Sequence, residues 1–422
     1  MKQQYTITEY QSVIADKIVP NYTTVSKDVF DALKSMILTS NASLDFIQLI
    51  AQKGVGEVIK ARNYVGLIIT KSGTVIEILP KIAKNQNNVK VREILLKMLK
   101  TLKGDVPFKH MQNANLNIAR LPLLEIFIRM FIIEALDLVR HGLKGSYQVV
   151  QSNESLFKGK LKVNEHILLN SAHKERCFVE YDNFEMNRPE NCIIKTTLLF
   201  LIRITSNLRN KTDLNKLLLM FSEIDESVNI ENDFQRITNQ RDMKDYENIM
   251  RWCRVFLQRK SFSPFVGENI AVSLLFPMEK LFESYIASFF QRYSVKNNIE
   301  IKVQDKTFYI FDDPTCFRII PDIVLNQKST KLCVVCDTKW KLLSQSLKNY
   351  GISQSDMYQM YVYQKKYEAQ KIYVIYPKSD DLLTDKQIEF KSTDGIDIQV
   401  CFIDLMNDIE DEVNRLFEYI FQ

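Results

Sequence analysis

Two stretches of the sequence decide the fold of its C-terminal part: residues 319–325 read IIPDIVL, and residues 333–340 read CVVCDTKW. Each stretch is an almost continuous apolar run, which is typical of a strand that is covered on both faces. Each run also contains one acid, Asp322 in the first and Asp337 in the second. A carboxylate in an apolar strand is costly to bury unless it is paired or holds a cation. The two runs therefore predict a covered sheet that carries a polar site.

The pattern on either side of these runs predicts helices and strands in alternation over residues 263–422. A helical repeat of apolar residues over 277–293 precedes three strands, at 299–303, 318–325 and 331–340. A helix over 353–367, strands at 372–376 and 398–402, and a helix over 405–421 follow. Helices that alternate with apolar strands indicate a mixed sheet flanked by helices.

The chain ahead of residue 263 divides into two regions. Residues 1–85 contain two strands, 64–70 and 74–79, joined by a Lys-Ser-Gly turn, which predicts a β-rich N-terminal domain with a helix or two. Residues 86–262 show apolar residues at helical spacing and predict a mainly helical middle region, in which 178–181 is either a strand or an extended connection. A polar stretch at 83–88 indicates a linker between the two regions. The whole chain is therefore expected to be a multidomain α+β or α/β protein.

The composition excludes several classes of protein. With 46% apolar and 25% charged residues, the 422-residue chain is typical of a soluble globular protein. A net charge of +5 is far too small for a protein that coats nucleic acid by charge alone, so any DNA contact is expected to be local. The most apolar stretch, 121–139, contains four charged residues, and the first residues lack an apolar leader. We therefore expect a cytoplasmic protein with no membrane contact and with its seven cysteines as reduced thiols.

The chemistry is expected on this sheet, where two adjacent strands each carry an acid. Because side chains alternate along a strand, Asp337 and Lys339 project to the same side of the sheet. Carboxylate oxygens suit a hard cation such as Mg²⁺, which can activate a water molecule and stabilise charge on a phosphate. The lysine can orient that water or neutralise the developing charge. The residues therefore indicate phosphodiester hydrolysis; the alternative is an ordinary buried salt bridge between Lys339 and one of the acids.

Two predicted helices bring further candidates to this site. Asp356, Gln359 and Tyr363 share one face of the helix over 353–367, so Gln359 and Tyr363 can support the site from beside it. The same face is also compatible with plain solvated surface. Glu283 lies inside the apolar pattern of the helix over 277–293, either as a third acid over the metal or as the solvent edge of that helix.

Several segments resemble a known family. Pro321-Asp322, followed after fourteen residues by Asp337-Thr338-Lys339, is similar to the signature of PD-(D/E)XK nucleases. Longer segments, spread over most of the chain, resemble McrC, the nuclease subunit of McrBC-type restriction systems. They are YVGLI at 64–68, EILPKI at 77–82, PMEKLFE at 277–283, CDTKWK at 336–341 and SDMYQMYVY at 355–363.

The resemblance implies a role for each matching residue. Asp322 and Asp337 would be metal ligands, Lys339 the catalytic lysine, and Glu283 the helix-borne acid that is a third metal ligand in many members of the superfamily. Gln359, with Tyr363, matches a Q-x-x-x-Y element that follows the lysine in some nucleases of this restriction-endonuclease-like fold. The chain departs from many relatives ahead of Asp322, where Ile320 stands in place of an arginine, and the role of nearby Arg318 stays open.

The resemblance also implies partners and cofactors. The family partner is an McrB-like AAA+ motor that binds and hydrolyses GTP, and residues 1–85 would dock on this motor and stimulate it. A G-x-x-x-x-G-K-[ST] phosphate loop is absent from the sequence, which agrees with GTP being bound by the partner. The cofactor would be Mg²⁺, with Mn²⁺ as a substitute, and the substrate would be double-stranded DNA.

The leading hypothesis is thus a metal-dependent DNA endonuclease subunit that acts when assembled on the motor. One alternative is a non-catalytic adaptor with a nuclease-like fold that activates the motor. Another is a stand-alone nuclease, although the long extension ahead of residue 263 argues against it. The sequence leaves open which DNA is recognised and whether it must be methylated.

Overall fold

The computed structural model describes residues 3–39, 46–82, 87–102, 107–110, 119–237, 243–257, 270–297, 299–327, 332–380, 382 and 388–421. The chain forms two compact units: Met1–Leu123 together with Lys260–Gln422 is the first, and Leu124–Arg259 is the second. The sequence suggested boundaries at residues 86 and 263 instead. Most of the expected linker, residues 83–86, lies outside the described residues.

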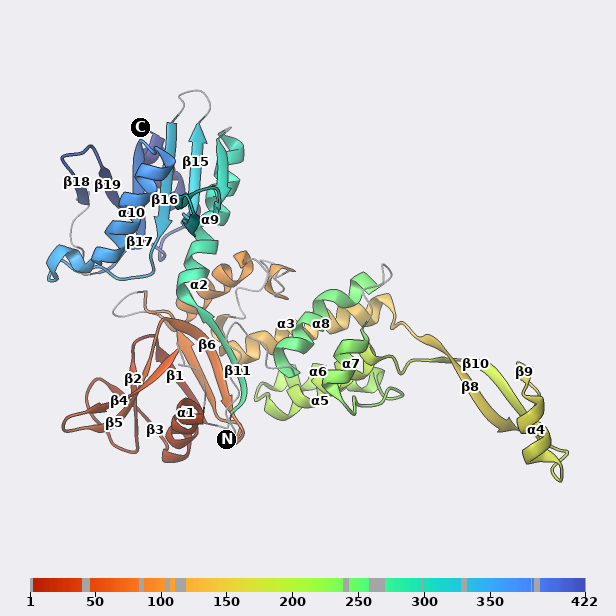
Figure 1. The fold of residues 1–422 in the computed structure, drawn as a ribbon. Helices are drawn as coiled ribbons and strands as arrows, with labels where there is room; N and C mark the ends of the chain where they lie inside the picture. The colour runs from red at the N-terminus through yellow and green to blue at the C-terminus, as the bar shows by residue number, and fades with distance from the viewer. Residues whose placement is uncertain are drawn as a thin grey trace. The chain divides into compact units, whose positions relative to one another are not determined.

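Two four-stranded sheets form the N-terminal part of the first unit (Figure 1). One sheet has the order β3 (Tyr22–Val25), β2 (Ser12–Ala15), β5 (Gly56–Ala61), β4 (Ile47–Gln52). The other has the order β1 (Gln4–Thr8), β7 (Val75–Leu79), β6 (Tyr64–Thr70), β11 (Ile270–Pro277). Helix α1 (Lys27–Thr39) shares one apolar core with both sheets. The strand pair expected from the sequence is confirmed as the antiparallel pair β6–β7.

Strand β11 completes the N-terminal sheet although it comes from a distant part of the sequence. Its residues were expected to belong to the C-terminal region, but β11 pairs antiparallel with β6 in the N-terminal sheet. Gly66 of β6 has a φ of 135°, and a Cβ placed there would lie 2.0 Å from the carbonyl oxygen of Leu274. Only glycine therefore allows the two backbones to approach this closely.

Helix α2 (Asn88–Thr101) follows these sheets, and its Asn87 cap accepts a hydrogen bond from the amide of Val89. The helix packs against β7 and α9, so it belongs to the first unit rather than to the middle region. A short 3₁₀ turn, Pro107–His110, contacts it.

A six-stranded mixed sheet forms the C-terminal part of the same unit. Its order is β12 (Glu300–Val303), β15 (Ile323–Gln327), β16 (Leu332–Thr338), β17 (Lys371–Pro377), β19 (Asp397–Ile403), β18 (Ile388–Lys391). The pairs β16–β17 and β17–β19 are parallel, and the other pairs are antiparallel. A mixed sheet covered by helices is the arrangement that the sequence predicts.

Three helices cover this sheet. They are α9 (Met278–Lys296), α10 (Gln354–Tyr367) and α11 (Ile409–Phe421), and a 3₁₀ turn, Lys348–Gly351, precedes α10. In β17, Val374 joins the apolar core that also contains Met360 of α10, whereas the neighbouring Tyr373 packs on Tyr419 of α11. Helices α10 and α11 therefore cover opposite faces, and α9 packs beside α11.

The expected strand at 318–325 is two separate strands. Strand β14 (Thr315–Arg318) forms a small hairpin with β13 (Tyr309–Asp312), and β15 begins only at Ile323. Residues 319–322 form an irregular segment between them. Asp322 therefore lies directly ahead of the inner strand β15 rather than within a strand.

The second unit consists of a helical body and an arm. The body contains α3 (Leu123–His141), α5 (Pro189–Ile204), α6 (Leu208–Met220), α7 (Ile230–Arg236) and α8 (Lys244–Leu257). The arm consists of β8 (Ser146–Glu154), β9 (Lys160–Leu161), α4 (Val163–Asn170) and β10 (Cys177–Glu185). Figure 1 shows β8 and β10 as a long ribbon that ends at β9 and α4. The segment 178–181 is thus part of a strand.

Two expectations about the chain as a whole can be compared with the structure. Among the helices formed by the described residues, none combines the length and the apolar character needed to cross a membrane. All seven cysteines are free thiols.

Candidate functional site

Strand β16 carries two of the site residues at its C-terminal end. Asp337 lies within the strand and is only 2% exposed, and Lys339 follows the strand. The amide of Lys339 donates to the carbonyl of Ile375 in β17, which fixes the lysine backbone beside the sheet. The Nζ of Lys339 lies 2.7 Å from Oδ2 of Asp337. This contact is an ion pair without the alignment of a good hydrogen bond, since Oδ2 is buried and has no hydrogen-bond donor of acceptable geometry among the described residues.

Asp322 is bound to the same strand end. Its Oδ2 accepts hydrogen bonds from the backbone amide and the hydroxyl of Thr338, each at 2.7 Å. Thr338 stands between Asp337 and Lys339. The two acids and the lysine that the sequence singles out are therefore brought together, and Thr338 is a residue that the sequence reasoning missed.

Burial raises the pKa of both carboxylates. Burial, and then the charge of Asp322, raise the pKa of Asp337 to about 7, against the opposing effect of Lys339. Burial likewise raises the pKa of Asp322, although the hydrogen bonds from Thr338 oppose it. For Lys339, burial acts to lower the pKa, but the negative charges of Asp337, Asp322 and Asp356 outweigh it and hold the pKa above its ordinary value. The site thus keeps a charged ammonium beside two acids whose pKa values are raised above those of free carboxyls.

Gln359 and Tyr363 of α10 connect Lys339 to the segment ahead of Asp322. The side-chain oxygen of Gln359 accepts a hydrogen bond of 2.9 Å from Nζ of Lys339. Its amide nitrogen donates to the hydroxyl of Tyr363 at 2.6 Å, and this hydroxyl donates to the carbonyl of Ile320 at 2.9 Å. Because both ends of the amide are engaged, Gln359 holds the ammonium in one position. The Q-x-x-x-Y pair expected beside the site therefore contacts it directly.

Glu283 of α9 does not join the two acids. Its Oε1 accepts a hydrogen bond of 2.6 Å from the side chain of Gln304, and the backbone amide of Gln304 donates to the carbonyl of Asp322 at 2.8 Å. In the part of the chain that the structure describes, no group of three His, Cys, Asp or Glu residues is placed to hold one metal ion. Glu283 is thus linked to Asp322 through Gln304, while the carboxylate pair consists of Asp322 and Asp337.

Asp356 influences the site although the sequence reasoning gave it no role. It lies in the first turn of α10, where Ser353 caps the helix by accepting from the Asp356 amide at 3.1 Å. Its charge contributes to the raised pKa of Asp337 and of Lys339. Its place on the same helical face as Gln359 was visible in the sequence, so this signal could have identified it.

Trp340 directly follows Lys339 and packs on the opposite side of the sheet from Gln359. Its ring packs on Phe282 of α9 with a centroid distance of 5.4 Å, and its Nε1 donates to the carboxylate of Glu9 at 2.8 and 3.0 Å. Glu9 follows β1, is 1% exposed and also accepts from the amide of Lys81 at 2.9 Å. Burial raises the pKa of Glu9 to about 8. The N-terminal sheet region thus holds the residue that directly follows the site lysine.

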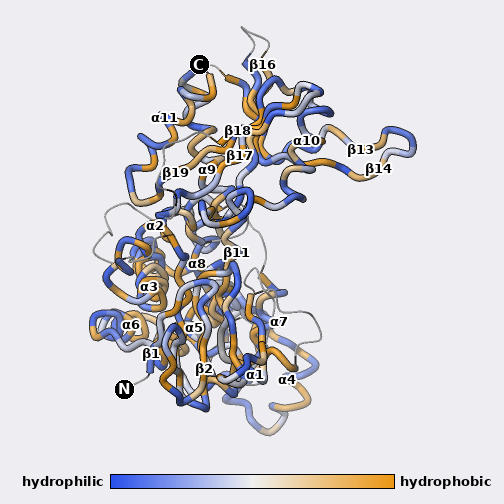
Figure 2. The backbone as a smooth tube through the Cα atoms, turned by 90° about the vertical axis from the view of Figure 1, so that its left-hand side faces the viewer, coloured by the Kyte–Doolittle hydropathy of each residue, from blue (hydrophilic) through white to orange (hydrophobic). Residues whose placement is uncertain are grey.

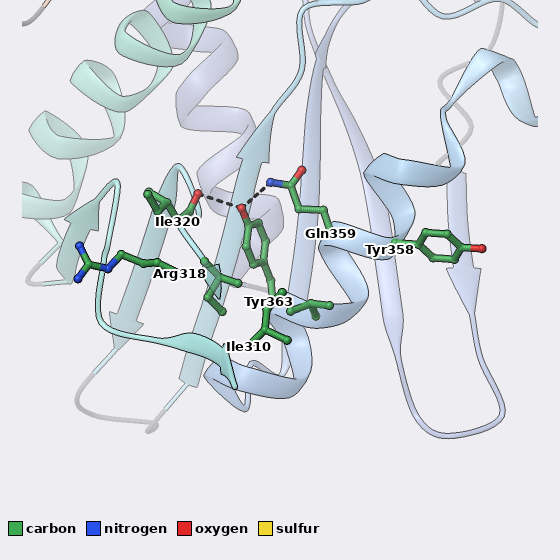
Figure 3. Close-up of a pocket in the computed structure, with 8 residues that line it drawn as sticks. Ile310, Arg318, Ile320, Tyr358, Gln359 and Tyr363 are labelled. Atoms are coloured by element: carbon green, nitrogen blue, oxygen red, sulfur yellow. Dashed lines mark hydrogen bonds between the residues drawn. The ribbon is translucent and has the colours of Figure 1, made fainter. Parts of the chain in front are cut away.

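A pocket lies next to the site. It has a volume of about 490 Å³, and its lining consists of Ile310, Arg318, Ile319, Ile320, Tyr358, Gln359, Val362 and Tyr363. Figure 3 shows Arg318 and Tyr358 on opposite sides of the pocket, with Tyr363 and Ile320 between them. Gln359 belongs both to this pocket and to the hydrogen-bond chain that holds Lys339.

The fold and the site together define a class: a mixed α+β protein in which a buried acid, a half-buried acid and a lysine meet at one strand end of a six-stranded sheet. The chain belongs to the family of McrBC 5-methylcytosine restriction system components, because the family model matches residues 59–377. This range includes all five site residues expected from the sequence, and the match confirms the family resemblance.

Two solved structures have a similar fold. In a refined half-complex from a tetradecameric assembly of Thermococcus gammatolerans McrB AAA+ hexamers with bound McrC, one chain is 20% identical to this one. The similarity covers 99% of this chain and 100% of that chain, with a TM-score of 0.72. A chain of the cryo-EM structure of the Thermococcus gammatolerans McrBC complex is 21% identical over 71% of this chain and 90% of that chain, with a TM-score of 0.50. At these identities the similarity establishes the fold, and no curated protein matches the chain.

Proposed function

We propose that this chain is the DNA endonuclease subunit of an McrBC-type, GTP-dependent restriction system, with a PD-(D/E)XK active site that uses Mg²⁺. The observation that carries the proposal is the meeting of Asp322, Asp337 and Lys339 at the end of β16. Two acids and a lysine brought together by adjacent strands suit hydrolysis of a phosphodiester. Membership of the McrBC component family agrees with that reaction.

The donor set fits a hard divalent cation. Asp337 is buried, its Oδ2 lacks an aligned hydrogen-bond donor among the described residues, and its pKa is raised to about 7. A cation bound between Asp322 and Asp337 would offset the cost of burying two carboxylates, and Mg²⁺ is commonly held by one or two carboxylates together with substrate phosphate. When bound, Mg²⁺ supplies Lewis-acid activation of the attacking water, and Mn²⁺ offers the same chemistry.

The residues of the chain have distinct tasks in this proposal. Asp322 is kept in place by the two hydrogen bonds from Thr338, which leaves its other oxygen for a ligand. Lys339 presents a charged ammonium that neutralises negative charge developing on the phosphate. Gln359 orients that ammonium from α10. Glu283 acts at a distance, by holding Gln304 against the backbone of Asp322.

The proposed partner is an McrB-like AAA+ motor, and the arm of the second unit is the better candidate for its docking surface than residues 1–85. The tip of the arm exposes a cluster of large apolar side chains: Leu156, Phe157, Val163, Ile167, Leu168 and Leu169. A soluble chain that exposes such a cluster commonly uses it to bind a protein partner. The chain of similar fold in the larger complex is an McrC bound to McrB hexamers. GTP would be bound by the motor, and the substrate would be double-stranded DNA.

The second candidate function is that of a non-catalytic adaptor, which has a nuclease-like fold and activates the motor. A buried acid beside a lysine can be a structural ion pair, and such pairs also perturb pKa values. The hydrogen-bond chain through Gln359 favours catalysis, because it fixes a lysine that a simple adaptor does not need.

Cleavage assays distinguish the two functions. The purified chain, mixed with its motor, GTP, Mg²⁺ and DNA, should cut DNA, and Lys339→Ala should abolish cutting while GTP hydrolysis by the motor stays stimulated. Full cutting by Lys339→Ala would reject the proposed active site. Absence of cutting by the unmodified chain, with stimulation intact, would favour the adaptor.

A further inference from the structure

The hairpin β13–β14 exposes aromatic side chains beside the proposed active site. Phe311 is 55% exposed and Phe317 is 68% exposed, and their rings lie 6.0 Å apart in an edge-to-face arrangement. Figure 2 shows the hairpin projecting beyond α10. Two large rings exposed together form an apolar surface that is available to a ligand.

The hairpin is held firmly against α10, so its aromatic rings have a defined position. Phe308, which precedes β13, packs edge-to-face on Tyr367 with a centroid distance of 4.7 Å. Lys366 forms a salt bridge of 3.0 Å with Asp312 at the hairpin tip. Both contacts come from the C-terminal turn of the helix that also carries Gln359.

The pocket at the base of this hairpin leads to the site lysine. Its apolar lining includes Ile310, Ile319, Ile320 and Val362, while Arg318 and Tyr358 supply polar groups on opposite sides. Arg318 is exposed, and its Nε donates to the neutral hydroxyl of Tyr309 at 2.8 Å, so this bond leaves the positive charge available. Gln359 completes the lining and binds Lys339. A ligand in the pocket would therefore be continuous with the substrate of the site.

The charges at the hairpin indicate which part of a nucleic acid each region meets. Asp312 and Asp313 at the tip would repel phosphates, so the tip suits bases rather than the backbone. Arg318 at the base of the hairpin suits a phosphate. Aromatic rings stack on bases that have left the duplex stack, or wedge between base steps.

We propose that the pocket and the aromatic pair bind the substrate DNA beside the scissile phosphate, with Arg318 on the backbone and Phe311 and Phe317 against locally unstacked bases. This inference rests on the proposed nuclease function and adds a base-contacting subsite to it. It also gives Arg318 a role in place of the arginine that is missing directly ahead of Pro321.

The test measures DNA binding by the full chain with two probes: a fluorescein-labelled duplex, and the same duplex with a short central bubble. Changing both Phe311→Ala and Phe317→Ala should weaken binding of the bubble duplex by about tenfold or more, since stacking on each ring is worth several-fold to a hundredfold in affinity. Binding of the intact duplex should change less. A 2-aminopurine base in the bubble should report reduced contact with the variant.

Two further variants make the test specific. Changing Phe311→Leu and Phe317→Leu keeps apolar bulk and should weaken bubble binding nearly as much as alanine, because stacking needs the ring. Arg318→Ala should make the plot of log affinity against log salt concentration less steep by about one, the change expected for the loss of one phosphate contact. The control replaces the exposed ring pair of the arm, Tyr147→Ala with Phe184→Ala, whose rings lie 5.2 Å apart. This control should leave DNA binding unchanged.

Several outcomes would overturn the inference. These are unchanged bubble binding by the alanine pair, equal loss in the arm control, or no DNA binding by the unmodified chain. Loss of GTPase stimulation with unchanged DNA binding would also reject it and assign the hairpin to a protein partner. Failure of the nuclease function would be recognised separately, as absent cleavage by the unmodified chain despite DNA binding that depends on the rings.

Discussion

At the scale of single residues, Asp337 decides between a metal site and a structural ion pair. In the metal-free protein, Asp337→Ala should leave the melting temperature unchanged or raise it, because the variant relieves the cost of a buried acid beside Asp322. Added Mg²⁺ should stabilise the unmodified chain but not the variant. Melting curves with and without Mg²⁺ measure both effects.

The same variant should lose DNA cleavage by about 100-fold or more, as expected when a group that stabilises transition-state charge is removed. Asp411→Ala, which changes an exposed acid of α11, is the control and should alter neither property. A structural ion pair predicts the reverse for stability: Lys339 would be left without its partner, and the metal-free variant would lose about 3–5 kcal/mol.

Gln359 offers a second test at this scale, because its side-chain amide links Lys339 to Tyr363. Gln359→Ala should lower kcat for DNA cleavage by roughly 10–100-fold, the range of a mispositioned catalytic group, with little change in KM. Gln291→Ala in α9 is the matched control. Steady-state cleavage kinetics measure kcat and KM separately. A rise in KM with unchanged kcat would instead indicate that Gln359 contributes to DNA binding rather than to the position of Lys339.

The site residues that were predictable from the sequence are those spaced at the repeat of a strand or of a helix, so that they share one face. Asp337 of β16 and Lys339, which directly follows that strand, are two positions apart, and Gln359 and Tyr363 are four apart in α10. Thr338 was missed because its bond to Asp322 depends on where the irregular segment 319–322 returns to the sheet. Glu283 was expected near the metal, but whether a helix-borne acid reaches a strand end depends on helix packing that no local pattern encodes.

At the scale of elements, the bond between Glu9 and Trp340 joins the loop after β1 to the end of β16. The pKa of Glu9 in the folded chain is about 8, above its ordinary value of 4.5. Between these two values the folded state binds more protons than the unfolded state, so the stability contributed by this group falls as the pH rises from about 4.5 to 8. Glu9→Gln should remove that fall.

Urea unfolding of the unmodified chain and of Glu9→Gln, at several pH values from acid to above 8, gives the difference between their free energies of unfolding at each pH. Glu418→Gln, at an exposed position of α11, is the control and should follow the unmodified chain. Parallel curves for Glu9→Gln and the unmodified chain would show that the Glu9 carboxyl titrates normally.

Long apolar elements were predictable and short or distant ones were not. The helices α9 and α10 and the strands β16, β17 and β19 follow from their periodicity, and so does the hairpin β6–β7. The strands β13, β14 and β18 have four residues each, too few for a pattern. The sequence of β11 suits a strand, but its partner β6 lies 200 positions earlier, measured from Ile270 to Thr70.

At the scale of the whole molecule, point variants test the docking surface that we propose for the motor. Leu168 at the tip of the arm is 80% exposed, so Leu168→Asp should leave the fold intact and abolish stimulation of the motor's GTP hydrolysis. Leu219→Asp in α6, where the leucine is 75% exposed, is the control from the same unit. Stimulated GTPase activity measures the effect.

The alternative surface, residues 1–85, is tested by Ile18→Asp, since Ile18 is 94% exposed. Loss of stimulation by this variant, with normal stimulation by Leu168→Asp, would assign docking to the N-terminal region. Point variants are needed here, because deleting residues 1–85 would remove β6 and leave β11 without its partner.

The pairing of β11 with β6 also constrains how the chain is made. During synthesis, β6 emerges from the ribosome long before β11, and until then β6 is the edge of its sheet, although six of its seven residues are buried in the finished protein. An exposed apolar edge of this kind invites pairing with other chains. The nascent N-terminal region therefore lacks the strand that covers this edge until the second unit has been translated. Truncated products that end before residue 270 should consequently be prone to aggregation.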